Sequence, residues 1–214
     1  MIQKMIEQVR EFQKEFNLTK NDIPTEISQE EVKLRYDLFV EEYDEYLEGY
    51  EAEKKGLEYF TTKKGEYVNT FVYKVDAIID MLYIACGTIV THGWKFNHYN
   101  PLIENYSDNI TQKRIYEIIN CYLNSSNKYD YRFSYIDRLI DMILNLASIN
   151  NVYYKLPELF NEVHASNMSK LDDNNQPIIN TIDSEYYDPN KPIGKVLKSK
   201  NFFEPKLKEI LFPK

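Results

Sequence analysis

The stretch that decides the fold is residues 67–91, YVNTFVYKVDAIIDMLYIACGTIVT. Its apolar residues point in nearly every direction around a helix, which is the pattern of a helix buried on all sides. The exception is a narrow stripe of Asp76, Asp80, Tyr83 and Gly87, spaced by four, three and four residues. Aspartates are rarely buried without a partner. We therefore predict a central helix whose two aspartates face another charged group.

The rest of the chain predicts an all-α fold around this helix. Apolar residues recur at helical spacing in five further segments, which are 2–17, 29–55, 111–123, 135–149 and 158–166. Ser28 and Glu31 form a capping-box pattern at the start of the second of these. From residue 167 on, polar turn formers and short apolar runs predict an extended C-terminal tail with one small hairpin.

Composition limits the class of protein. With 214 residues, 43% of them hydrophobic, the chain is long enough for one domain with its own core. A net charge of -8 argues against non-specific binding to nucleic acid or to an anionic membrane. The apolar run around 75–90 is too short and too acidic for a membrane span. Cys86 and Cys121 lack CxxC spacing, so we expect two small buried hydrophobic residues in a reduced, cytoplasmic protein.

A second acidic segment lies on the helix predicted over 29–55. In Glu41-Glu42-Tyr43-Asp44-Glu45, Glu42 lies at the margin of the apolar face and Glu45 follows one turn later. If this helix packs antiparallel to the central one, Glu42 and Glu45 converge with Asp76 and Asp80. Buried carboxylates that cannot all ionise unaided require a cation.

Four converging carboxylates offer only oxygen ligands, which suit Mg²⁺ or Mn²⁺ better than zinc. Mg²⁺ usually completes its shell with waters and substrate phosphates, so the chemistry indicated is hydrolysis or transfer at a phosphate. Glu41 is adjacent but turned outward, where it could act as the base that orients a water.

Each acidic segment also has a simpler interpretation. The acids from Glu41 to Glu48 could be a solvated helix face. Asp76 and Asp80 could lie on a helix that is less buried than its pattern suggests.

On these residues the chain resembles the all-α nucleoside triphosphate pyrophosphohydrolases, the superfamily of MazG-like and phosphoribosyl-ATP pyrophosphohydrolase-like proteins. Their mark is EExxE on one helix and ExxD on a later one. Residues 41–45 fit the first motif, and Asp80 fits the last acid of the second. The preceding Glu of the family falls on Ala77, a departure that puts the number of bound metals in question. Asp76 lies on the same helical side as Asp80 and is a candidate substitute.

The resemblance extends beyond the two motifs. Residues 82–88, LYIACGT, resemble the LYVxxGT continuation, and residues 163–170, VHASNMSK, are very similar to a C-terminal VHxSNMSK segment. The resemblance covers about residues 1–93 and 155–205. Residues 95–150 do not match the family and look like an added helical pair. We thus expect a single domain, 1–214: a helical bundle of this type with an inserted helical pair. The pair could extend a dimer interface or cover the substrate.

The resemblance implies a function and roles. It implies hydrolysis of a nucleoside triphosphate, deoxy or non-canonical, between the α and β phosphates, giving the monophosphate and pyrophosphate with Mg²⁺, or Mn²⁺ in its place. Glu42, Glu45 and Asp80 would be metal ligands, with Asp76 a provisional fourth, and Glu41 would position or deprotonate water. Family members are dimers or tetramers, so a homodimer is expected.

Five residues are candidates for substrate binding. Lys170, Lys195 and Lys198 could offset the charge of a triphosphate, or each could be a solvated surface charge. Asn167 could bind a base edge or a sugar hydroxyl, or it could cap a helix C-terminus. Tyr83 could stack on a base, although core packing is the simpler role.

Two other functions remain open at this point. Ala77 favours a nucleotide-binding or regulatory helical module that kept the fold and lost the chemistry. A purely structural helical protein is the third possibility, and it predicts no stabilisation by metal.

Overall fold

The computed structural model describes residues 1–96, 106–125, 129–184, 186–189 and 196–213. Helices hold 62% of the chain against a single two-stranded sheet in the described part, so the all-α prediction is confirmed. The elements are α1 (Ile2–Glu15), α2 (Gln29–Lys54), β1 (Tyr59–Thr61), β2 (Tyr67–Asn69), α3 (Thr70–His92), α4 (Asp108–Asn124), α5 (Tyr129–Ile149), the 3₁₀ turn η1 (Tyr153–Lys155), α6 (Leu156–Met168) and α7 (Leu207–Leu211).

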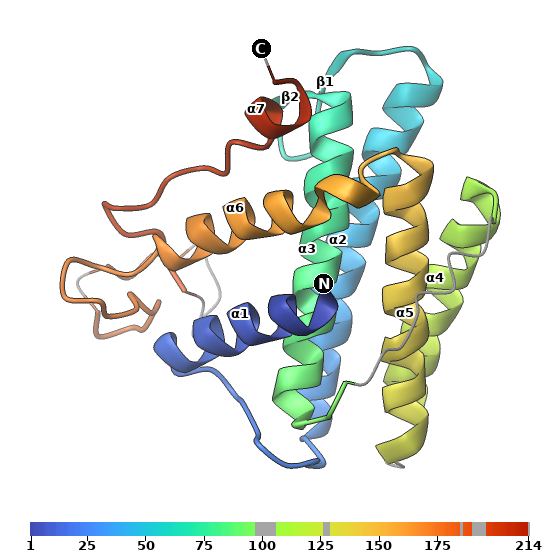
Figure 1. Ribbon diagram of the computed structural model, residues 1–214. Coiled ribbons are helices and arrows are strands. Elements are labelled where there is room, and N and C mark those ends of the chain that lie inside the picture. The colour runs from blue at the N-terminus through green and yellow to red at the C-terminus, as the bar shows by residue number, and fades with distance from the viewer. Residues whose placement is uncertain (97–105, 126–128, 185, 190–195, 214) are drawn as a thin grey trace.

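Helices α2 and α3 form the centre of the molecule, joined by the β1–β2 hairpin (Figure 1). The Ser28 hydroxyl accepts the Glu31 backbone N–H at 3.1 Å, as the capping pattern predicts. The Glu31 carboxylate does not reach back to the cap, because it accepts from the Arg35 guanidinium at 2.7 Å.

Helix α3 begins at Thr70 and not at residue 67. Tyr67–Asn69 pair with Tyr59–Thr61 as an antiparallel strand, and the Asn69 side chain then accepts the Val72 N–H at 3.1 Å as the helix cap. The helical pattern over residues 67–69 hid the hairpin, because a three-residue strand is too short to show a period of its own.

The central position of α3 explains its composition. It contacts α1, α2, α5, α6 and α7, and residues such as Val75, Ile78 and Leu82 are fully buried. Helix α3 is also long and apolar enough to cross a membrane, but 83% of its most apolar window is buried inside the fold. Packing against five neighbouring helices therefore accounts for its hydropathy.

The inserted pair packs within the chain. Helix α5 lies along α3 and α4 lies along α2, so the four helices form a bundle (Figure 1). The predicted apolar faces are buried, but α5 starts at Tyr129, earlier than the predicted residue 135. Cys121 on α4 is exposed, which corrects the expectation that both cysteines are buried.

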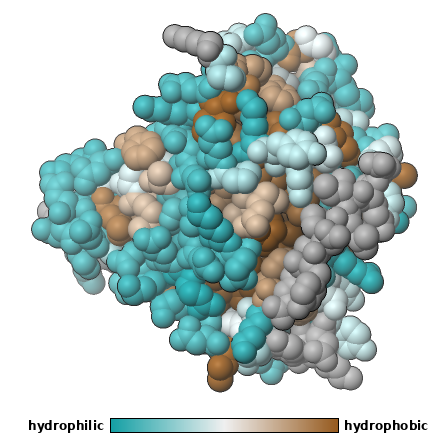
Figure 2. Space-filling view, viewed as in Figure 1, coloured by the Kyte–Doolittle hydropathy of each residue, from teal (hydrophilic) through white to brown (hydrophobic). Residues whose placement is uncertain are grey.

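Helices α1 and α6 cross α3 on another side, and the tail runs from α6 back to α7 beside the start of α3 (Figure 1). Before α7, the described residues of the tail form turns and irregular segments, with isolated antiparallel bridges of Leu171 with Pro177 and Ile179 with Val196 in place of the predicted hairpin. Helix α7 was not predicted. On the face shown in Figure 2, hydrophilic residues dominate, and hydrophobic residues reach the surface in the upper part, where α7 lies.

Candidate functional site

The acids of α2 and α3 face each other in antiparallel order. The charge of Glu45 acts on Asp76, and the charge of Glu42 acts on Asp80. The later acid of α2 is therefore paired with the earlier acid of α3, as in antiparallel helices. This order follows from the hairpin connection, which forces the two helices to run in opposite directions. The four carboxylates that were predicted to converge therefore belong to one electrostatic cluster.

Burial and mutual repulsion make this cluster resist ionisation. Burial, and then the charge of Glu45, raise the pKa of Glu42 to about 8. Burial, and then Asp80, raise the pKa of Asp76 well above its usual value, and burial with Glu42 does the same for Asp80. Burial and repulsion therefore favour the protonated forms of these acids, and a bound cation would favour their charged forms.

The structure also shows why Asp76 is the acid on this turn of α3. Ala77 is only 1% exposed and packs in the core. Asp76 is partly accessible and shares its surroundings with Asp80 and Glu45. A carboxylate at position 77 would be placed among apolar side chains, whereas position 76 faces the other acids.

A divalent cation fits the donor set, although the side chains are not arranged around one. The donors are carboxylate oxygens, which suit Mg²⁺. Within the described ranges, no three acidic, histidine or cysteine side chains gather closely enough to hold a metal ion. The Glu45 carboxylate instead accepts from the Lys64 ammonium at 2.6 Å, and Glu41 accepts from it at 3.0 Å. Glu42, Glu45, Asp76 and Asp80 are the residues that would hold the cation.

The C-terminal end of α6 brings two of the predicted substrate residues to these acids. The Lys170 ammonium donates to Asn167 Oδ1 at 2.6 Å, and its charge opposes the rise in the pKa of Asp80. Asn167 is not the helix C-cap, because α6 continues through Met168 and Ser169 is its cap. Lys170 and Asn167 therefore lie at the edge of the acidic cluster, hydrogen-bonded to each other.

Tyr83 takes the simpler of its two predicted roles. It is 8% exposed, and its ring stacks against Phe160 and meets Phe12 edge-on. Its hydroxyl hydrogen-bonds Asn167 and lies 3.1 Å from His164 Nδ1. The ring faces are used in the core, so base stacking by Tyr83 is corrected to support of Asn167.

The tail holds the predicted candidate Lys198 together with two groups, Phe202 and Glu204, that the sequence did not single out. The Lys198 ammonium pairs with Glu204 at 2.7 Å and lies 4.1 Å from the centre of the Phe202 ring. The charge of Glu204 reaches Asp76, so this part of the tail borders the acids. Lys195, the remaining candidate, lies outside the described residues.

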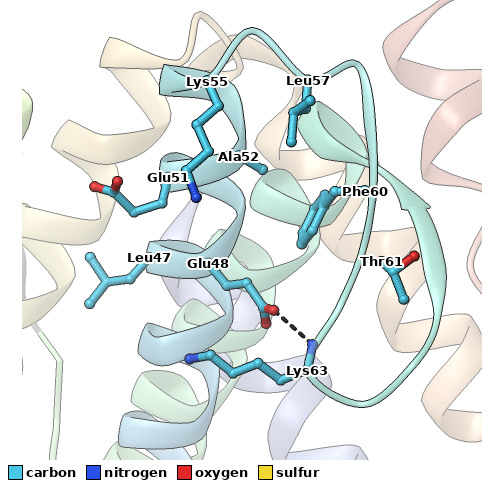
Figure 3. Close-up of a pocket in the computed structure, with 9 residues that line it drawn as sticks. All are labelled: Leu47, Glu48, Glu51, Ala52, Lys55, Leu57, Phe60, Thr61 and Lys63. Atoms are coloured by element: carbon cyan, nitrogen blue, oxygen red, sulfur yellow. Dashed lines mark hydrogen bonds between the residues drawn. The ribbon is translucent and has the colours of Figure 1, made fainter.

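Two cavities are lined by other residues than these acids. One, of about 590 Å³, lies between α2 and the hairpin, and Glu48 on its wall accepts the Lys63 backbone N–H at 2.7 Å (Figure 3). The other, of about 770 Å³, surrounds α7. Neither is lined by Glu42, Asp76 or Asp80, so these acids lie outside both cavities.

Comparison with known proteins agrees with this geometry. The family model of phosphoribosyl-ATP pyrophosphohydrolase matches residues 9–101, which include α2, the hairpin and α3. No curated protein and no solved structure matches the chain. The family implies nucleotide pyrophosphohydrolase activity. Residues 9–101 of this chain are thus similar to the phosphoribosyl-ATP pyrophosphohydrolase family, which belongs to the MazG-like all-α nucleoside triphosphate pyrophosphohydrolase superfamily.

Proposed function

We propose that this protein hydrolyses a nucleoside triphosphate, deoxy or non-canonical, to the monophosphate and pyrophosphate with Mg²⁺. The observation that carries the proposal is the acidic cluster itself. Two motifs far apart in the sequence place four carboxylates on facing sides of α2 and α3, where burial and repulsion favour a bound cation.

The chain's own residues then have separable tasks. Glu42, Glu45, Asp76 and Asp80 hold the cation, which when bound would polarise a phosphoryl oxygen and lower the pKa of water. Glu41 is half exposed at the rim, where its carboxylate can accept a proton from the attacking water. Lys170 supplies positive charge beside Asp80, where an anionic substrate needs it.

A panel of ribo- and deoxynucleoside triphosphates, assayed for pyrophosphate with Mg²⁺ and with Mn²⁺, tests the proposal. We expect release of pyrophosphate from at least one of them and no release in EDTA. Glu45→Gln should abolish the activity, whereas Glu51→Gln, the same change on the solvent side of α2, should not. Absence of release from every nucleotide with both metals would contradict the proposal.

The competing function is a nucleotide-binding or regulatory module without catalysis, which Ala77 favoured. The position of Asp76 weakens that alternative, because Asp76 shares the cluster with Asp80 and Glu45 and can take the place of the missing Glu. Binding of a non-hydrolysable triphosphate analogue without turnover of any substrate would favour the module.

We also propose a homodimer as the working assembly, by analogy with the family. Light scattering coupled to size-exclusion chromatography measures the mass directly. A mass close to the 25.6 kDa of one chain would contradict the dimer.

A further inference from the structure

The tip of the β1–β2 hairpin is fixed to α2. Its turn is closed by the Gly65 N–H, which donates to the Thr62 carbonyl at 2.8 Å, and Gly65 has a φ of 85°. The Lys63 backbone N–H donates to the Glu48 carboxylate at 2.7 Å (Figure 3). The next residue along this anchored turn is Lys64.

Lys64 is a cation placed on the acidic motif by this turn. Its ammonium lies 3.0 Å from a Glu41 oxygen and 2.6 Å from a Glu45 oxygen, so it bridges two carboxylates one helical turn apart. Burial lowers the pKa of Lys64, but the hydrogen bonds that its ammonium donates to Glu45 and Glu41 outweigh this and raise the pKa overall. Lys64 therefore stays charged at neutral pH, and its charge also opposes the rise in the pKa of Glu42.

Glu45 cannot serve Lys64 and a metal equally. A divalent cation bound by Glu45 takes electron density from the carboxylate and repels an ammonium held within 3 Å of it. The Lys64 side chain is 56% exposed while it pairs with Glu45, and its four-carbon stem has many rotamers, so it can turn away without unfolding the hairpin. The strongest anion that then comes near it is the triphosphate of the substrate.

We propose that Lys64 is an exchangeable cation of the site, which neutralises Glu41 and Glu45 before metal binds and pairs with the substrate's phosphates afterwards. This inference rests on the proposed function, because the phosphates belong to that substrate. Under this proposal Lys64 lowers the affinity for the metal, with which it competes for Glu45, and raises the affinity for the nucleotide, whose phosphates it attracts.

Lys64→Met removes the charge and keeps most of the side-chain volume, Lys64→Arg keeps the charge, and Lys63→Met is the matched control on the same turn. Mn²⁺ binding is measured on the nucleotide-free protein by electron paramagnetic resonance. Two exposed ion pairs are weak, so we expect Lys64→Met to bind Mn²⁺ about fivefold more tightly. Loss of a charged partner of a phosphate should raise KM for the nucleotide about tenfold, with a smaller effect on kcat. Lys64→Arg, which keeps the charge, should change both measurements less than Lys64→Met does, and Lys63→Met should stay close to wild type in both.

The outcomes separate the two proposals. Weaker Mn²⁺ binding by Lys64→Met would show that Lys64 organises the metal ligands and would overturn the exchange. Unchanged Mn²⁺ affinity together with unchanged KM would reduce Lys64 to a surface ion pair. If the wild-type protein releases no pyrophosphate from any nucleotide, the proposed function fails, while the Mn²⁺ measurement still tests whether Lys64 competes with the metal.

Discussion

On one face of α2 the polar side chains have hydrogen-bond partners, whereas on the other face acidic side chains lie close to other acids. On one face, tyrosine hydroxyls bond to the inserted helix α4: Tyr43 donates to the Gln112 carbonyl at 2.8 Å and Tyr46 to the Asp108 carboxylate at 3.2 Å. On the other face, the carboxylates of Glu42 and Glu45 meet the acids of α3, and burial with repulsion opposes their charge.

This difference separates structure from function within one helix. The tyrosine face is a completed interface, where each buried hydroxyl has a partner and stabilises the packing. On the acidic face, Lys64 and Lys170 only partly offset the burial and repulsion that raise the pKa values of Glu42 and Asp80, and such perturbed groups are concentrated at functional sites. The inserted helix α4 packs on the tyrosine side of α2, and α5 packs on α3 and α4, which supports a role for the pair in the scaffold of this chain.

The largest expected effect comes from breaking the acidic face. Asp80→Asn should lower pyrophosphate release by about 100-fold, the scale of losing a central electrostatic partner. The same change should raise the melting temperature in EDTA, because it removes a charge that burial and Glu42 disfavour. Asp44→Asn, on the exposed side of α2, is the control for both assays. Full activity in Asp80→Asn would remove Asp80 from the site.

The next largest effect is expected on stability, at the close contact between Gly49 of α2 and Lys74 of α3. A Cβ at Gly49 would lie 2.6 Å from Cγ of Lys74, a buried lysine whose ammonium pairs with Glu53. Gly49→Ala should therefore destabilise the fold by about 2 kcal/mol, the usual cost of overpacking. Urea denaturation measures this. No loss of stability would show that Lys74 can move aside without cost.

The pH dependence of stability is a third test. The pKa of Glu42 is raised to about 8 from its ordinary 4.5, so the folded state retains a proton that the unfolded chain releases. In EDTA, the free energy of unfolding should fall as the pH rises from 4.5 to about 8. The raised pKa values of Asp76 and Asp80 should change the stability in the same direction. Urea denaturation at pH 5 and pH 8 measures the difference, and Glu42→Gln should reduce it. Stability that rises over this range would contradict a repulsive cluster.

The smallest expected effect lies on the tyrosine face. Tyr46→Phe removes the hydroxyl that donates to Asp108 and should cost about 1 kcal/mol, with little change in activity. Tyr116→Phe, on an exposed residue of α4, should cost less. A large loss of activity in Tyr46→Phe would mean that the two faces are not separate.

The sequence by itself determined the helices and the identity of most acids. The 3.6-residue period located α1, α2, α3, α4 and α6 closely, because long amphipathic segments repeat the signal many times. The same period placed Asp76 and Asp80 on one side of a helix that is otherwise apolar. The short elements gave no such signal, so β1, β2 and α7 were missed.

Only the tertiary structure decided which groups meet across the chain. In the sequence Lys64 is one residue of a basic loop, and only the fold shows that it pairs with Glu41 and Glu45. The fold also places the Tyr83 ring in the core. It also brought Phe202 and Glu204 of the tail to the border of the site. The physical reason is that such contacts depend on how the chain turns between elements, and turn geometry is not encoded in any local period.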